Sequence, residues 1–237
     1  MERGLLLDLW GTLFWPRLPL EEYHLMRAKM ILRALDQDEL SFDAVYKAYM
    51  DARRLADKIR NTTLHEVDVI GEAIILLDKL GIEPTGDLLR ELEEAYLHPF
   101  VTQLELAPGA VELIRTAREH GFRVILASNT ISGRHARILL MEKGVLGLFD
   151  YLAFSNEIGF RKPHPKFFSV IVHQTGISPS RSVFVGDEEG DIAGARAFGM
   201  KTVAFTGFHE YNGGVAPDYF AKSMSEVAEI IKVLSSA

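Results

Sequence analysis

The stretch Gly4-Leu5-Leu6-Leu7-Asp8-Leu9-Trp10-Gly11-Thr12-Leu13 (residues 4–13) decides the fold. An apolar run from Gly4 to Leu7 leads into Asp8, and Gly11-Thr12 then breaks the run. Such a run, bounded by turn residues, predicts a buried strand. Because open α/β sheets carry their chemistry beyond the carboxyl ends of the strands, we expect Asp8 to be a functional residue at that edge.

The composition predicts a globular protein with a substantial core. The chain has 237 residues, of which 48% are hydrophobic and 25% charged, which is enough for one large or two modest domains. A formal net charge of -7 argues against nonspecific nucleic-acid binding, which needs clustered Lys and Arg. The absence of cysteine excludes a disulfide framework, a thiol nucleophile and Cys-ligated zinc.

The apolar segments bear on where the protein works. The longest apolar run of this kind, Ala73 to Leu77, is far below the roughly 20 residues that span a bilayer, so we expect no membrane association. The sequence shows no cleavable apolar leader, and it has no cysteine. Together these features predict a cytoplasmic protein.

Residues 20–100 predict a helical segment without strands. Apolar residues recur there at helical spacing and indicate four amphipathic helices, at residues 25–35, 45–55, 69–80 and 88–96. We expect the breaks between them at Asp36 to Ser41, Asn61 to Thr63 and Gly81 to Gly86.

From Pro108 onward the sequence alternates between helical and extended patterns. The expected helices are 110–120, 134–143, 166–176 and 191–198, and the expected strands are 122–127, 151–154, 182–185 and 202–205. This alternation predicts an α/β fold with a doubly wound parallel sheet. We therefore expect a Rossmann-like core at residues 1–16 and 101–237, with residues 17–100 inserted as a separate helical domain.

Three further polar signals follow apolar strands. They are Ser128-Asn129, Lys162, and the acidic pair Asp187 and Asp191. Each alone has an ordinary interpretation: Ser128 as a helix cap, Lys162 as a solvated lysine before a proline turn, the acidic pair as a polar turn. Their placement at successive strand ends predicts that they gather with Asp8 in one site.

With these motifs the sequence resembles the haloacid dehalogenase-like hydrolase superfamily, most of whose members are magnesium-dependent phosphatases. The resemblance covers nearly the whole chain and implies that the helical insertion is a cap domain. It implies that Asp8 attacks phosphorus, that Lys162 assists it, and that Thr12, Ser128, Asn129 and Lys162 hold the phosphoryl group. It also implies Mg²⁺ held by Asp8, the backbone carbonyl of Trp10 and Asp187, with Asp191 as a further ligand or behind one.

Trp10 departs from the pattern of the family's phosphatases, which carry a second aspartate at this position. That aspartate protonates the leaving alcohol and then activates water, whereas an indole exchanges no proton near neutral pH. Losing such help costs about 10²- to 10⁴-fold in rate. We therefore expect slow turnover unless another group compensates. Glu21, Glu22 and His24 lie just downstream, although an exposed position on a helix is the simpler expectation for each of them. Glu188 and Glu189 are also near in sequence, and Glu188, which is attached to the acidic turn, could support the metal ligands.

Two other features concern the substrate. The indole of Trp10 is expected to pack against the cap as an apolar contact. Within the cap, Arg53, Arg54, Lys58 and Arg60 form a basic cluster on one predicted helix. Such clusters are usually solvated faces offset by acids, so substrate recognition is the less favoured interpretation. We expect the cap to close over the site and exclude water.

The function expected first is a Mg²⁺-dependent phosphatase of a small phosphorylated metabolite, acting as a monomer or homodimer. Two alternatives stay open. The superfamily's true dehalogenases carry an aromatic residue at the position of Trp10 and need no metal, which suggests a 2-haloacid dehalogenase, although Asp187 and Asp191 argue against it. The other alternative is a catalytically impaired regulatory protein that keeps the phosphate and metal pocket.

Overall fold

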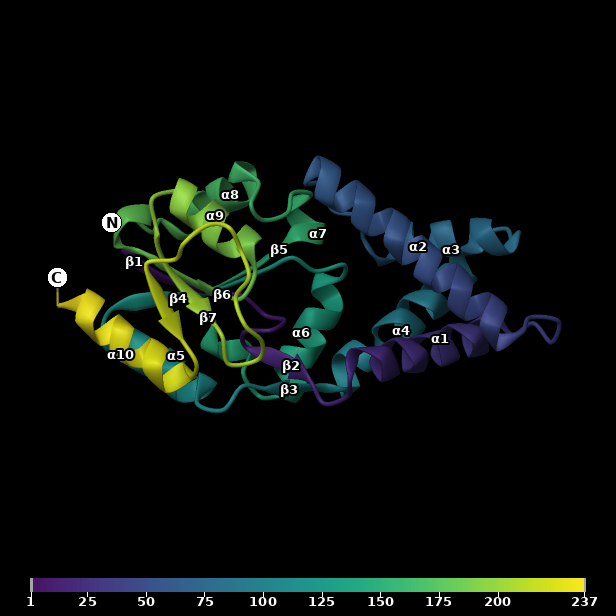
Figure 1. Cartoon of the computed structure of the whole chain (residues 1–237), viewed down its shortest axis with the longest axis horizontal. Coiled ribbons are helices and arrows are strands. Elements are labelled where there is room, and N and C mark those ends of the chain that lie inside the picture. The colour runs from purple at the N-terminus through teal and green to yellow at the C-terminus, as the bar shows by residue number, and fades with distance from the viewer. Residues whose placement is uncertain (1, 237) are drawn as a thin grey trace.

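Six parallel strands form the central sheet, in the order β5-β4-β1-β6-β7-β8 (Figure 1). The computed structural model describes residues 2–236. The strands are β1 (Arg3–Leu7), β4 (Phe122–Ser128), β5 (Tyr151–Phe154), β6 (Val183–Gly186), β7 (Lys201–Phe205) and β8 (Tyr219–Ala221). The predicted doubly wound parallel sheet is confirmed, and the strand that ends at Asp8 lies in its middle.

Different helices cover the two faces of the sheet. Leu5 and Leu7 belong to one apolar cluster, with α5, α6 and α10, whereas Leu6 belongs to a second cluster, with α8 and α9. Because side chains alternate along a strand, burial on both faces explains the unbroken leucine run. These helices are α5 (Ala110–Glu119), α6 (Gly133–Glu142), α8 (Pro165–Thr175), α9 (Glu189–Ala197) and α10 (Met224–Ser235).

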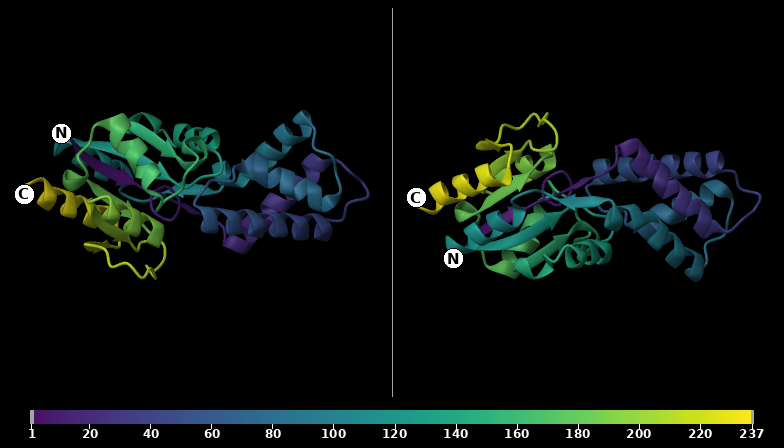
Figure 2. Two further views of the ribbon diagram at one scale, coloured as in Figure 1. Left: turned by 90° about the horizontal axis from the view of Figure 1, so that it is seen from above. Right: turned by 90° about the horizontal axis from the view of Figure 1, so that it is seen from below.

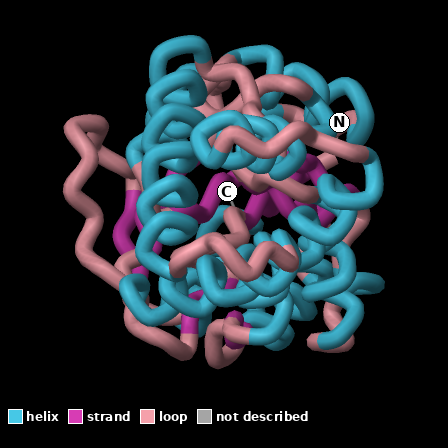
Figure 3. Tube along the Cα trace, turned by 90° about the vertical axis from the view of Figure 1, so that its right-hand side faces the viewer, coloured by secondary structure: helices cyan, strands magenta, loops and turns pink. Residues whose placement is uncertain are grey.

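Four helices form a separate lobe, which we call the cap, at one end of the molecule (Figure 2). They are α1 (Leu20–Leu35), α2 (Phe42–Thr63), α3 (Val69–Leu80) and α4 (Gly86–Thr102). Seen from the cap end, helices lie in front of and around the strands (Figure 3). The predicted domain limits at residues 16/17 and 100/101 stay a prediction, because helix packing alone does not define a unit that folds independently.

One predicted break was wrong, and two short strands beside the cap were not predicted. The predicted break at Asn61 to Thr63 is wrong, because α2 continues to Thr63 and ends at Leu64, which adopts a left-handed conformation. The sequence pattern also missed β2 (Phe14–Pro16) and β3 (Leu104–Leu106), a two-stranded antiparallel ribbon where the chain enters and leaves the cap. The remaining elements are α7 (Ser155–Ile158) and the short 3₁₀ helices at Leu146–Leu148 and Pro179–Arg181.

A buried glutamate joins the cap to the core. Glu66, in the segment after α2, accepts hydrogen bonds from Arg60 of the cap at 2.9 Å and from Arg161 of the core at 2.6 Å. It also accepts one from Ser155. Its side chain is 2% exposed, so water screens these ion pairs poorly. The contact fixes one side of the cap over the sheet.

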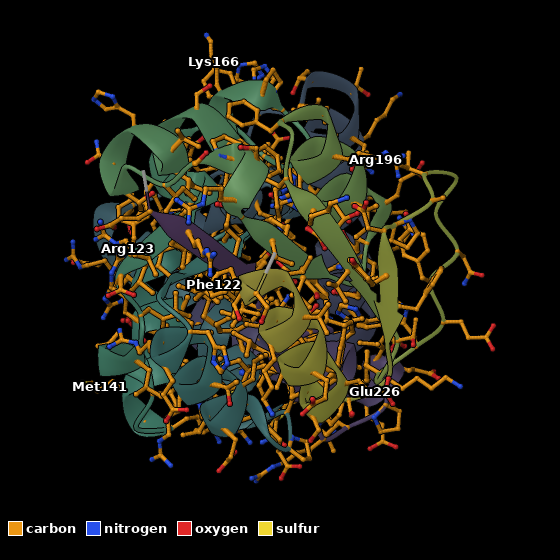
Figure 4. All side chains as sticks on the ribbon, turned by 90° about the vertical axis from the view of Figure 1, so that its left-hand side faces the viewer. Phe122, Arg123, Met141, Lys166, Arg196 and Glu226 are labelled. Carbon is orange, nitrogen blue, oxygen red and sulfur yellow. The ribbon has the colours of Figure 1, made fainter. Side chains whose placement is uncertain are left out.

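All strands of the central sheet point their carboxyl ends toward the cap. Figure 4 views the opposite edge, where Phe122 and Arg123 begin β4. Every helix within residues 2–236 is too short or too polar to cross a lipid bilayer. The space between the carboxyl edge and the cap is therefore where the predicted functional residues meet.

Candidate active site

Asp8 lies at the carboxyl edge of the sheet, where β1 ends, as the sequence predicts. Its backbone N–H donates to the carbonyl of Val185 on β6 at 2.9 Å, so strand pairing extends up to this residue. Asp8 is 7% exposed and lines a pocket of about 290 Å³ bounded by the sheet edge and the cap. The middle strand thus holds a nearly buried carboxylate rigidly at the bottom of the pocket.

Lys162 is the cation nearest to Asp8. Its Nζ lies 2.5 Å from Asp8 Oδ1 and 2.6 Å from Asp191 Oδ1, and it donates to the carbonyl of Ala127 at 2.8 Å. Burial by itself lowers the pKa of Lys162, but the charges of Asp191 and Asp8 outweigh it and raise that pKa above its ordinary value. The ammonium therefore stays charged between the two carboxylates.

Three buried carboxylates gather here, and one lysine, Lys162, contacts two of them. Oxygens of Asp8, Asp187 and Asp191 all lie within 4.8 Å of one another. Burial raises the pKa of Asp8 well above its usual value, and the charges of Asp191 and Asp187 add to this against the opposing charge of Lys162. Burial and the charge of Asp191 raise the pKa of Asp187 to about 6. This excess of negative charge, with hard oxygen donors, fits a divalent cation such as Mg²⁺.

Neighbouring groups fix the position of Asp187. Thr12 donates to its Oδ1 at 2.8 Å, and His209 Nε2 lies 2.7 Å from its Oδ2. Gly11 has a φ of +80°, and a Cβ there would come within 2.3 Å of Asp187 Oδ2. Only glycine therefore suits position 11. His209 was missed by the sequence analysis because it lies in the loop 206–218, which carries no pattern that points to a site.

The residues expected to hold phosphate have different surroundings. Ser128, at the end of β4, is 2% exposed and lines the pocket, as does Asn129. The Asn129 side chain accepts from the backbone N–H of Lys162 at 2.9 Å and donates to the Lys162 carbonyl at 3.2 Å, so it fixes the lysine's backbone. Thr12 is fully buried against Asp187. Direct contact of these three residues with phosphate stays a prediction.

Trp10 lines the pocket and packs against the cap. Its ring lies 5.4 Å from that of Tyr23, edge to face, and 6.5 Å from that of Phe100, stacked. The apolar contact expected for the indole is thus present. Of the acids considered as replacements, Glu21 and Glu22 are exposed on α1, whereas Glu188 is exposed but lines the pocket. The role of the Trp10 carbonyl as a metal ligand stays a prediction.

The basic cluster of α2 divides into two groups. Arg53 and Arg60 line the pocket, whereas Arg54 and Lys58 are exposed elsewhere on the helix. The expectation of a solvated face therefore holds for only half of the cluster. Arg27 of α1 also lines the pocket and was missed, because an arginine in an amphipathic helix usually faces solvent.

The profile of the haloacid dehalogenase-like hydrolase family matches residues 2–199. The chain belongs to this family and is an enzyme of the hydrolase class, which confirms the resemblance. It is 26% identical to the glyceraldehyde 3-phosphate phosphatase of Methanopyrus kandleri over 167 residues, covering 68% of this chain and 71% of the relative. It is also 26% identical to a phosphoglycolate phosphatase of Nitrosococcus oceani, covering 66% and 72%.

Solved structures with this fold include a phosphatase and dehalogenases. The 2-haloacid dehalogenase of Pseudomonas syringae pv. Tomato DC3000 superimposes with a TM-score of 0.72 at 16% identity, covering 98% of this chain and 99% of that structure. At this identity the likeness establishes the fold alone. The choice between the two chemistries rests on the residues of the site.

Proposed function

We propose that the protein is a Mg²⁺-dependent phosphatase that hydrolyses a small phosphate monoester through an aspartyl phosphate on Asp8. The observation that carries the proposal is the cluster of Asp8, Asp187 and Asp191, two of which, Asp8 and Asp191, contact the ammonium of Lys162. Isolated buried carboxylates repel an anionic substrate, so this arrangement makes sense where a cation accompanies that substrate. The phosphatase names of two relatives support the same class of reaction.

The donor set suits magnesium. Asp8, Asp187 and the carbonyl of Trp10 would hold the ion, and Asp191, which contacts Lys162, would either join them or keep the lysine in place. When bound, Mg²⁺ supplies positive charge that stabilises the phosphoryl oxygens during transfer. The buried negative charge described above supports this assignment.

The chain's own residues divide the reaction between them. One Asp8 oxygen attacks phosphorus while the bond from phosphorus to the ester oxygen breaks, and the departing alkoxide takes up a proton as alcohol. Lys162 compensates the charge on Asp8 and on the phosphoryl group, and Ser128 and Asn129 line the place where the phosphoryl oxygens would lie. Water then cleaves the aspartyl phosphate, which releases inorganic phosphate and restores the Asp8 carboxylate.

Trp10 leaves the proton for the leaving alcohol to another source. Glu188 is the exposed acid of the pocket wall nearest in sequence to the acidic cluster, and bulk water reaches it. We therefore expect slow turnover on esters with poor leaving groups and faster turnover on esters of acidic alcohols, which need no proton.

A second candidate is a 2-haloacid dehalogenase. The contacts of Trp10 with Tyr23 and Phe100 favour it, because they put an apolar aromatic surface where a phosphatase carries an acid. In that reaction Asp8 displaces halide from carbon and water hydrolyses the resulting ester, without a metal. Asp187 and Asp191 weigh against it because they put negative charge near a carboxylate substrate.

One experiment separates these candidates. The protein is incubated with p-nitrophenyl phosphate and small phosphate esters, in Mg²⁺ or in EDTA, and with 2-chloropropionate in EDTA. We expect phosphate release that needs Mg²⁺ and falls about 10⁴-fold or more in Asp8→Asn. Asp87→Asn, at a side chain that is 85% exposed, serves as the control.

Each opposite result has a clear meaning. Halide release in EDTA would replace the proposal with the dehalogenase. Phosphate release that survives Asp8→Asn would remove Asp8 from the mechanism. Tight binding of a phosphate mimic without any turnover would identify a regulatory protein instead.

A further inference from the structure

The pocket that Asp8 lines has one apolar side. It is formed by side chains that we call the apolar wall: Trp10, Leu20, Leu97 and Phe100. The indole of Trp10 is held by an edge contact with Tyr23, with ring centroids 5.4 Å apart, and by stacking on Phe100 at 6.5 Å. Leu20 is 52% exposed although it lines a pocket. Apolar surface that stays open inside a pocket indicates contact with a ligand.

The charged side chains of the same pocket have partners within the cap. Arg60 pairs with Glu72 at 2.8 Å and with Asp57 at 2.7 Å, and Arg53 pairs with Asp57 at 3.6 Å. Burial by itself lowers the pKa of Arg27, but neighbouring tyrosines and the charge of Glu72 raise it above its ordinary value. The cap itself therefore stabilises these arginines as cations, whereas the exposed part of the apolar wall gains contacts only when a ligand covers it.

The residues of the pocket also decide which leaving groups can depart. Within residues 2–236, the acids that line the pocket besides Asp8 are Asp57, Glu72 and Glu188. Asp57 and Glu72 are ion-paired with Arg60, and Glu188 is exposed. The indole of Trp10 carries one N–H, which does not act as an acid near neutral pH. A leaving group that lies on Trp10 therefore meets apolar surface and receives no proton from it.

We infer that the apolar wall is a subsite for the leaving group and that the substrate is an aryl phosphate, the phosphate monoester of a hydroxyl on a planar, apolar ring. The inference rests on the proposed phosphatase function, in which the phosphoryl group lies at Asp8 and Lys162. An aromatic ring packs on an indole better than an alkyl chain of similar size does, because ring stacking adds to the burial of apolar area. The pocket, of about 290 Å³, suits a single small ring.

The same tryptophan favours an acidic leaving group. When an Asp8 oxygen bonds to phosphorus, the bond from phosphorus to the phenol oxygen breaks, and both of its electrons stay on that oxygen. The phenoxide is stable enough to depart as an anion, and it takes up a proton from water afterwards. An alkoxide is far more basic and needs its proton while the bond breaks. Trp10 therefore favours aryl over alkyl esters in two ways, through contact and through chemistry.

Four esters separate the effect of the ring from the acidity of the leaving group. They are phenyl, benzyl, trifluoroethyl and ethyl phosphate, for which kcat and KM are measured in Mg²⁺. We expect kcat/KM for phenyl phosphate to exceed that for benzyl phosphate by about 10²-fold or more, because benzyl alkoxide needs an acid. Trifluoroethyl phosphate has an acidic leaving group without a ring, so its KM should be about 10-fold higher than that of phenyl phosphate. Ethyl phosphate should be the poorest substrate.

Three variants test the wall itself. Trp10→Ala removes the stacking surface and Leu20→Ser removes an exposed part of it, so both should raise the KM for phenyl phosphate and leave that for trifluoroethyl phosphate nearly unchanged. Ile74→Ser is the matched control, because Ile74 is an apolar residue of α3 that is 43% exposed and lies outside the pocket. It should behave as wild type. Leu20 is exposed at the start of α1, so the test survives if Trp10→Ala fails to fold.

Calorimetry in Mg²⁺ gives a readout without turnover. Phenylphosphonate and ethylphosphonate carry the same anionic group on a carbon–phosphorus bond, and they have no ester oxygen to release. We expect phenylphosphonate to bind wild type about 10-fold more tightly than ethylphosphonate, because its ring buries apolar area and stacks. The difference should shrink in Trp10→Ala and in Leu20→Ser but not in Ile74→Ser.

The outcomes distinguish the two proposals. Equal kcat/KM for phenyl and benzyl phosphate would overturn the acidic leaving group, and equal affinity for the two phosphonates would overturn the aromatic subsite. In both cases the phosphatase would stand. Binding of phenylphosphonate that depends on Trp10, without hydrolysis of any ester, would support the subsite and overturn the phosphatase.

Discussion

The two ends of the pocket carry opposite charge. At the core end, three carboxylates lie together, two of them contact Lys162, and the pKa values of Asp8 and Asp187 are raised. At the cap end, Arg27 and Arg53 line the pocket; the charge of Glu72 helps to raise the pKa of Arg27, and Arg53 pairs with Asp57 at 3.6 Å. Under the proposed function the core end holds a cation together with the anionic substrate, whereas the cap end contributes arginines to the pocket wall.

The two ends also differ in how they are held. Strand ends and backbone contacts fix the core end, such as the hydrogen bonds between Asn129 and the backbone of Lys162. Side chains of helices form the cap end, and Glu66 ties that lobe to the core. The proposed chemistry therefore lies at strand ends, while the opposite wall of the pocket is formed by side chains of the cap helices.

Removing Lys162 from the core end should have the largest effect. Lys162→Met leaves Asp8 and Asp191 without their shared ammonium, and we expect kcat/KM for phosphate esters to fall about 10³-fold. Lys166→Met, at an exposed lysine four residues further on, should behave as wild type. A Lys162→Met variant with more than a tenth of wild-type activity would show that a metal alone neutralises this end.

Weakening the ion pairs of Glu66 that join the cap to the core should lower the free energy of unfolding. Glu66→Gln removes the charge that Arg60 and Arg161 share, and we expect unfolding free energy to fall by about 3 kcal/mol, as when a buried ion pair loses one partner. Glu94→Gln weakens an exposed pair with Arg134 that also joins cap and core, together with a 3.2 Å contact to His135, so it should cost less than Glu66→Gln, about 1 kcal/mol. Equal midpoints in thermal unfolding for the two variants would refute the special role of Glu66.

Trp10 lines the pocket between the core end and the cap end. Its replacement tests whether the core end lacks an acid for the leaving group. Trp10→Asp restores a carboxyl group beside Asp8, and we expect kcat on alkyl phosphates to rise by up to about 10²-fold. Trp10→Asn introduces a side chain of the same shape as that of Trp10→Asp but without an acid, so its kcat should not rise. Equal rates for the two variants would mean that another acid already serves the leaving group.

The smallest effect concerns the stability of the metal-free core end. The raised pKa of Asp187, about 6, means that the folded protein holds this proton more tightly than the unfolded chain does. The stabilisation is present at low pH and is lost as pH rises through about 6. In EDTA at pH 7, Asp187→Asn should therefore stabilise the protein by about 1 kcal/mol, or a few degrees in midpoint.

Asp218→Asn serves as a control in which the pKa shift, and therefore the expected change in stability, has the opposite sign. Burial works against it, but hydrogen bonds from Lys201 and Thr202 keep the pKa of Asp218 below its ordinary value. Its folded-state stabilisation is present above the unfolded pKa, so Asp218→Asn should destabilise at pH 7. A loss of stability in both variants would show that hydrogen bonding of Asp187 to Thr12 and His209 outweighs its repulsion by Asp191.

The sheet could be predicted because its strands are buried on both faces. In any strand with one face in water, an unbroken apolar run such as Leu5 to Leu7 would expose leucine side chains, so it predicts a strand buried on both faces. The polar residue that ends each run then falls at the carboxyl edge of the sheet. The length of α2 could not be predicted in this way. Its last turn is stabilised by ion pairs of Arg60 with Glu66 and Glu72, which are tertiary contacts that local sequence does not reveal.

The residues of the site divide in the same way, into those that the sheet pattern predicts and those that only tertiary contacts place there. Asp8, Lys162, Asp187 and Asp191 could be predicted to meet because each follows a strand of one parallel sheet. His209 and Arg27 could not. The first comes from a loop without periodicity, and the second occupies a helix position that is usually solvent-exposed, where only the spacing to Tyr23 hints at a buried pair.

The close approach of Gly11 to Asp187 bears on how this enzyme can change over evolutionary time. Position 11 accepts no side chain and Thr12 is fully buried, so both are closed to variation. Residue 10, between them and Asp8, directs its side chain to the cap and leaves its neighbours undisturbed. A single codon there can exchange an acid for an aromatic ring without rebuilding the scaffold, which makes it a natural point of divergence between reaction types.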